Sequence, residues 1–81
     1  MDVKEAFAVV IVEQRKALGY SQERLALEAN IDRSYMSKLE RGLYQPSLEK
    51  ILSFARVFGV RPGELVDRVD ALVKDGSNSS T

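Results

Sequence analysis

The 81-residue chain contains no cysteine and no histidine. Without cysteine it can form neither a disulfide nor a thiolate metal site, which suits a reducing cytoplasm. Without histidine it lacks the commonest general base and metal ligand of proteins. The sequence also has no glycine-rich phosphate loop and no carboxylates clustered at catalytic spacing. We therefore expect no enzymatic activity, no cofactor and no bound metal.

Long hydrophobic runs are also missing from the chain. No apolar segment approaches the roughly 20 residues that a membrane-spanning helix needs. The first residues, MDVKEAF, lack the basic end and the small-residue cleavage site of a signal peptide. The length suffices for one domain, near the lower size at which a core is stable without disulfides or metals. These features predict a single cytoplasmic domain with no membrane partner.

Two short helices with a tight turn between them are predicted from Ser21 to Gly42. The Ser21 hydroxyl can accept a hydrogen bond from a free amide of a helix that begins at Gln22. Asp32 has the same position before a second helix that begins at Arg33. Gly42 can adopt the left-handed conformation that helix ends often require. This is the arrangement of a DNA-binding helix-turn-helix motif.

The inner faces of these two helices are predicted to be apolar. Leu25, Ala26 and Ala29 share one face of the first helix, and Met36 and Leu39 share one face of the second. The small alanines allow the two helices to approach closely. The outer face of the second helix then remains free to enter a DNA groove.

That outer face carries a polar and basic stripe. Its members are three or four residues apart: Arg33, Ser34, Ser37, Lys38 and Arg41, with Tyr35 beside them. Arginine and lysine can donate hydrogen bonds to guanine, and hydroxyl groups can bond several base edges. The alternative is an ordinary solvated helix face, which is what most charged helical stripes are. The caps, the short turn and the small residues together favour DNA binding.

The net charge gives only modest support to a nucleic-acid partner. Twelve basic residues balance 12 acidic ones, whereas DNA-binding proteins are often strongly basic. Residues 14–45, however, carry six basic and four acidic residues, and theirs is the only part of the chain with a net positive charge. This small excess predicts limited non-specific affinity and a steep dependence on salt.

Four motifs follow one another along the chain: QRKALGYSQERLA, IDRSYMSKLERG, QPSLEKILSFARVFGV and RPGELV. Through them, the segment from Val12 to Leu65 resembles a lambda-repressor-like helix-turn-helix domain of the Xre type. The resemblance implies an all-α, compact five-helix DNA-binding domain, a transcriptional regulator that binds a roughly palindromic operator as a homodimer. The segment DRSYMSKLERG is also similar to the recognition helix of the controller proteins of restriction-modification systems.

The resemblance also implies roles for individual residues, with a recognition helix at about residues 33–41. The positions that face the bases are Arg33, Ser34, Ser37 and Lys38. The positions near the sugar-phosphate backbone are Tyr35, Arg41 and Gln22, of which the last also braces the recognition helix. Tyr44, Gln45 and the start of the helix after Ser47 match backbone contacts on the other side. For Tyr44 and Gln45 the alternative is a simple loop role.

Arg15 and Glu40 match a structural pair that joins the first and third helices, so we exclude both from the DNA-binding site. A partly buried charge at this place needs its partner. Removal of one side is expected to cost roughly 3 to 5 kcal/mol if burial is complete.

The remaining chain predicts a scaffold of two further helices. Ser47 can cap a helix that runs to about Phe58 and ends at Gly59. We expect its apolar face to consist of Leu48, Ile51, Leu52, Ala55 and Phe58. Pro62 suits the first turn of a last helix, whose apolar stripe is Leu65, Val69, Leu72 and Val73. We expect the domain to span residues 1–75 and the GSNSST segment, residues 76–81, to be a disordered tail.

The first helix is predicted against its local propensity. The β-branched run in Ala6–Val12 suits a strand about as well as a helix, but no second strand exists to pair with it. Val10 and Val12 stand where the family usually has polar residues. We expect most of the apolar side chains around this helix to pack within the monomer. The alternative is that some of these apolar side chains form a subunit interface or the partner surface of an antitoxin-like protein-interaction module: Phe7, Val10, Val12, Phe54, Val57 and the 65–73 stripe.

Overall fold

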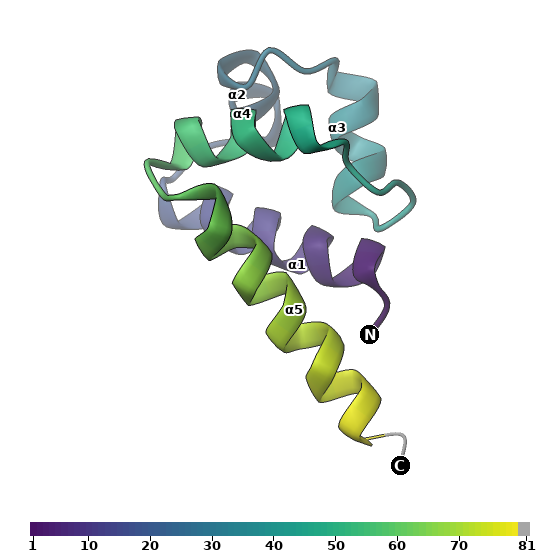
Figure 1. Cartoon of the computed structure of the whole chain (residues 1–81). Coiled ribbons are helices and arrows are strands. Elements are labelled where there is room, and N and C mark those ends of the chain that lie inside the picture. Colours follow the sequence, from purple (N-terminus) through teal and green to yellow (C-terminus); the bar gives the residue numbers. More distant parts are fainter. Residues whose placement is uncertain (80–81) are drawn as a thin grey trace.

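The structure is a computed structural model that describes the backbone of residues 1–79 and the side chains of residues 1–75. It contains five helices and no strand in this part of the chain. The helices are α1 (Val3–Ala17), α2 (Gln22–Glu28), α3 (Arg33–Glu40), α4 (Leu48–Phe58) and α5 (Pro62–Ser79). Figure 1 shows α4 lying across α2, with α5 running diagonally past α1. The prediction of an all-α, five-helix fold is confirmed.

The predicted helix starts are confirmed by side-chain caps. The hydroxyl oxygens of Ser21 and Ser47 accept hydrogen bonds from the backbone amides three residues later, at 3.0 and 3.3 Å. The Asp32 carboxylate accepts a bond of 3.2 Å from the Tyr35 amide. Asp2 caps α1 in the same way, through a bond of 2.9 Å from the Glu5 amide. Each cap satisfies an amide that has no partner inside its helix.

The end of α3 is fixed by Gly42, as predicted. Its φ of 76° lies in the left-handed region, where a residue with a side chain is strained. The Gly42 amide bonds the Leu39 carbonyl, and the Leu43 amide bonds the Lys38 carbonyl, both at 3.1 Å. These two bonds form a Schellman motif, which turns the chain sharply away from the helix axis. The turn sets the direction of the loop that leads to α4.

The core lies between α1 and the other four helices. Ala6, Val10 and Ile11 of α1 are at most 1% exposed, so the β-branched segment is helical and its packing within the monomer is confirmed. The Phe54 ring lies 6.0 Å from the rings of both Phe7 and Phe58. Burial of such aromatic side chains contributes much of the hydrophobic stabilisation in a domain of this size. The fourteen residues of this core come from all five helices.

The predicted inner faces of α2 and α3 are confirmed. Leu25, Ala26 and Ala29 pack in the same core as Met36 and Leu39, and each of the five is at most 3% exposed. On α5, Leu65 and Val69 are buried, while Leu72 and Val73 are partly buried against the core. The predicted stripe of α5 is therefore also confirmed.

The predicted apolar face of α4 is wrong for two leucines. Leu48 is 70% exposed and Leu52 is 48% exposed. Because α4 is apolar around most of its circumference, several faces are compatible with its sequence. The face that the core selects is centred on Phe54, and Leu48 and Leu52 lie at the edge of that face.

The alternative of a subunit interface at the first helix does not hold for its main members. Phe7, Val10 and Phe54 are at most 3% exposed and belong to the monomer core. They cannot contact another chain without unfolding the domain. Val57 packs against the same core and is partly buried, as is Val12.

The expected tail overlaps the last helix. The backbone of residues 76–79 continues α5 to Ser79, and residues 80–81 lie outside the described part of the chain. The domain boundary at residue 75 therefore stays a prediction. Figure 1 shows the C-terminal end of α5 projecting beyond the other four helices. None of the helices described here combines the length and apolar character needed to cross a membrane.

Candidate nucleic-acid interface

The candidate interface is the outer face of α3. Met36 and Leu39 bind this helix to the core, while Arg33, Ser34 and Arg41 are exposed. Ser37 and Lys38 are half-buried beside them. The arrangement leaves hydroxyl, guanidinium and ammonium groups on one side of a helix whose other side is fixed. Such groups are the donors and acceptors that read base edges in a major groove.

A network of three side chains fixes the position of α3 relative to α1 and α2. Arg15 Nε and Nη2 donate to the two carboxylate oxygens of Glu40, at 2.8 and 3.1 Å. The predicted structural pair is therefore confirmed. Gln22 Nε2 also donates to Glu40 Oε1, at 3.1 Å. This bond is the predicted bracing contact of Gln22, which is the first residue of α2.

Arg33 is held by a residue that the sequence did not single out. Its Nη1 lies 3.0 Å from Glu23 Oε2, in an ion pair whose side chains are 62% and 74% exposed. The pair joins the first turn of α2 to the first residue of α3. Because both groups are exposed, the pair is weak and the guanidinium can leave it for another acceptor.

Tyr35 and Tyr44 form a stacked pair next to the polar stripe. Their ring centroids are 5.2 Å apart and their planes differ by 29°. Burial raises the pKa of the Tyr35 hydroxyl, and the neighbouring Tyr44 raises it further. A tyrosine hydroxyl is protonated at neutral pH, so Tyr35 can donate a hydrogen bond. The stack brings Tyr44 of the α3–α4 loop beside α3, where the sequence predicted a contact with DNA.

Gln45 differs in position from the other predicted residues. It is exposed and also borders a small apolar cavity of about 120 Å³, together with Val3, Pro46 and Val66. One side of Gln45 therefore faces residues of α1 and α5. The structure places the other eight predicted residues on α2, on α3, at its C-terminal turn and in the loop that follows.

Two basic side chains lie over the stacked tyrosines. Lys38 Nζ is 5.8 Å from the centre of the Tyr44 ring, and Lys50 Nζ is 4.8 Å from the centre of the Tyr35 ring. Lys50 belongs to α4 and was not predicted as a site residue. Its contact joins residues 15 positions apart, and no local pattern in the sequence indicates it.

The comparisons with known proteins agree with this geometry. The family model described as Helix-turn-helix matches residues 11–65. Control protein C.BamHI of Bacillus amyloliquefaciens is 43% identical over 47 residues, which are 58% of each chain. This chain spans only 36% and 42% of the full length of two further curated relatives. An uncharacterized HTH-type transcriptional regulator of Methanothermobacter thermautotrophicus is 37% identical over 84% of this chain and 94% of its own.

A solved structure with similar sequence has the same fold. The restriction-modification controller protein C.AhdI of Aeromonas hydrophila superposes with a TM-score of 0.72 and is 40% identical. The match covers 76% of this chain and 94% of that protein. The family model covers more than half of the chain and its residues include both helices of the motif. The chain therefore belongs to the Helix-turn-helix family.

Proposed function

We propose that this chain is a sequence-specific DNA-binding transcriptional regulator that places α3 in the major groove. The observation that supports the proposal most is the division of α3 into two faces. Its inner face is fixed by the core and by the Arg15–Glu40–Gln22 network, while its outer face carries exposed donors and acceptors. A reading helix needs both features, since base recognition requires side chains held at fixed positions. The role is one of binding, in the cytoplasm, with no reaction to catalyse.

We assign the base contacts to Arg33, Ser34, Ser37 and Lys38. Of these, Arg33 has the geometry most suited to a guanine, because its guanidinium can donate to O6 and N7 together. Arg33 is the first residue of α3, at the N-terminal end where residues of a recognition helix contact bases.

We assign the sugar-phosphate contacts to residues that flank this stripe. They are Gln22 at the start of α2, Tyr35 and Arg41 on the recognition helix, and Tyr44 and Gln45 in the loop that follows. Gln22 donates one amide hydrogen to Glu40, and its second hydrogen remains for a phosphate. The Tyr35 hydroxyl can likewise donate a hydrogen bond to a phosphate oxygen.

We further propose that the regulator acts as a homodimer on a roughly palindromic operator. A two-fold axis presents two copies of α3 to major-groove segments about 10 bp apart, or a multiple of that distance. The α4 and α5 side chains that remain available for a subunit contact include Leu48, Leu52 and Val66, which are 70%, 48% and 48% exposed. Sedimentation equilibrium at the concentrations used for DNA binding tests this point, and a monomer bound to a single half-site contradicts it.

The experiment that tests the function is selection of bound duplexes from a random library at physiological salt. At this ionic strength, phosphate attraction alone does not give stable binding by a domain of low net charge. Recovery of a two-fold symmetric motif supports the proposal. Recovery of no motif overturns it, and co-purification of a small toxin would then support the antitoxin function. That alternative is weakened by the burial of Phe7 and Val10, which were its expected partner surface.

A further inference from the structure

We propose that Lys50 of α4 is a further DNA-backbone contact, and that the Tyr35–Tyr44 stack positions its ammonium group. The inference rests on the proposed function and extends the site beyond the residues that the family resemblance implied. The resemblance implied a backbone contact from the start of the helix after Ser47, and the inference adds to it a charged side chain of that helix, α4.

The first step is that the stacked tyrosines form a fixed platform. Tyr35 belongs to α3, whose start is capped by Asp32, and Tyr44 follows the Gly42 turn. The two rings overlap at a centroid distance of 5.2 Å, and Tyr35 is half-buried. The capped start of α3 restricts the position of the Tyr35 ring, and the Gly42 turn restricts the position of the Tyr44 ring. The platform therefore moves with α3.

The second step is that the platform holds two ammonium groups. Lys50 lies over one ring at 4.8 Å and Lys38 lies over the other at 5.8 Å. Both distances are within the range of a cation–π contact, which attracts the ammonium without neutralising its charge. Lys50 is half-buried, so its aliphatic stem is partly removed from water while its end group follows the ring.

Both lysines carry charges that no carboxylate of the described residues pairs with. In the part of the chain that the structure describes, five basic residues form ion pairs with carboxylates, and neither Lys38 nor Lys50 is among them. An ammonium group that no carboxylate compensates attracts an anion. The platform adjoins the base-reading stripe of α3, so the anion that this site fits is a phosphate of the same DNA duplex.

The alternative is that Lys50 only stabilises the packing of α4 on α3. The two roles differ in their salt dependence. A lysine that binds a phosphate releases a counterion, so its removal lowers the slope of log Kd against log salt by about 0.9 for each bound protomer. When the affinities of variant and wild type are matched at 1 M salt, this difference in slope makes the affinity of the variant at 0.15 M salt roughly 5-fold lower for each protomer. A packing role changes the stability of the domain and leaves the slope unchanged.

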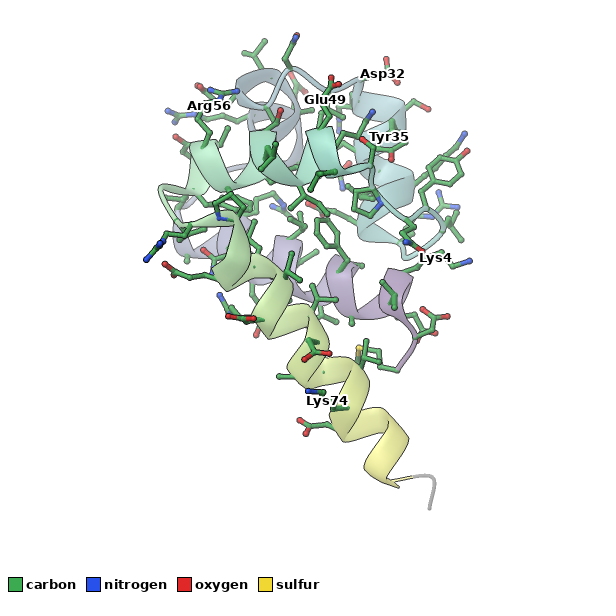
Figure 2. All side chains as sticks on the ribbon, in the orientation of Figure 1. Lys4, Asp32, Tyr35, Glu49, Arg56 and Lys74 are labelled. Atoms are coloured by element: carbon green, nitrogen blue, oxygen red, sulfur yellow. The ribbon has the colours of Figure 1, made fainter. Side chains whose placement is uncertain are left out.

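The test is a salt titration of Lys50→Gln with the selected operator and with a base-substituted operator. We expect equal weakening on both duplexes and the lower slope, with an unchanged circular dichroism spectrum. Arg56→Gln is the matched control, because it removes one cation from the same helix. Figure 2 shows Arg56 at the end of α4 that is remote from Tyr35. The control is expected to keep the wild-type slope.

The positioning role has its own readout. The Tyr35→Leu variant lacks the platform, so in that background we expect Lys50→Gln to change the salt slope by less than it does in the wild type. The Tyr35→Phe variant keeps the ring, so in that background we expect Lys50→Gln to lower the slope as much as it does in the wild type. A wild-type slope for Lys50→Gln, with the wild-type protein still binding its operator, overturns this inference alone. Failure of the wild-type protein to bind any selected duplex overturns the proposed function together with it.

Discussion

Replacement of Arg15 by alanine is expected to destabilise the domain strongly. The Glu40 side chain is only 6% exposed and the Arg15 side chain 16%, so the pair is largely removed from water. In Arg15→Ala, the carboxylate of Glu40 keeps only the Gln22 amide as a hydrogen-bond partner, and the Tyr20 carbonyl loses its bond from Arg15 Nη1. Loss of one partner of a fully buried ion pair costs about 3 to 5 kcal/mol. Because Arg15 is partly exposed, we expect about 3 kcal/mol.

This loss is large relative to the stability of such a domain. A chain of this length has a free energy of unfolding of about 4 to 12 kcal/mol. For domains of this size, 1 kcal/mol shifts Tm by about 4 to 8 °C, so the expected decrease in Tm is about 12 to 24 °C. Urea denaturation followed by circular dichroism at the helical band measures the free energy directly.

The matched control is Arg68→Ala. Arg68 pairs with Glu13 at 3.7 Å, but their side chains are 46% and 58% exposed. Loss of an exposed pair costs about 0 to 1 kcal/mol. A second comparison replaces both members of the buried pair, Arg15→Met with Glu40→Leu, which leaves no uncompensated charge and is expected to cost less than Arg15→Ala. If Arg15→Ala and Arg68→Ala destabilise the domain equally, burial of the pair is not what makes it important.

Four further predictions concern single substitutions. Arg33→Ala is expected to cost about 1 to 3 kcal/mol on the selected operator and to relax preference at one base pair; uniform weakening on all base-substituted duplexes would instead indicate a backbone contact. Glu23→Gln removes the ion pair that occupies Arg33, so competition titrations should show about 1.5- to 5-fold tighter binding to non-operator DNA. An unchanged affinity would show that the pair does not compete with DNA. Gly42→Ala is expected to lower stability by about 1 to 2 kcal/mol, because φ is 76° there and the added Cβ meets Glu5 only at an ordinary 3.5 Å. Gly63→Ala, in open space within α5, is the opposite case and should stabilise the domain by about 0.5 to 1 kcal/mol in the same thermal melts.

The helix ends could be predicted from the sequence because their causes are local. A cap joins residues three positions apart, so Ser21, Asp32 and Ser47 indicate helix starts without knowledge of the fold. The same holds for the left-handed glycines, Gly42 and Gly59. The cap at Asp2 was equally readable, since an acidic residue there precedes Glu5 by three positions.

The buried face of α4 could not be predicted in the same way. Apolar residues occupy most of the circumference of this helix, and the pattern alone does not say which of them meets the core. The selection depends on Phe54, whose ring fits between those of Phe7 and Phe58. This packing of the rings depends on the tertiary arrangement, and it leaves Leu48 and Leu52 at the exposed edge of the buried face of α4.

The candidate site was predicted in its composition but not in its contacts. The exposed stripe of α3 follows from helical periodicity, so its members could be named from the sequence. The Glu23–Arg33 and Lys50–Tyr35 contacts depend on how α2 and α4 cross α3. Sequence patterns carry no information on these crossing angles, so both contacts are visible only in the structure.

The short length of α3 links DNA recognition to the folding equilibrium. An isolated helix of eight residues is not stable in water, because its nucleation cost exceeds what so few hydrogen bonds return. The reading surface therefore exists only in the fraction of molecules that are folded. Under the proposed function, operator DNA binds this fraction alone and raises the melting temperature by mass action. A core variant that leaves a large part of the molecules unfolded lowers the apparent affinity even if it touches no nucleotide. For this protein, the occupancy of the operator reports the integrity of the whole domain as well as the chemistry of its surface.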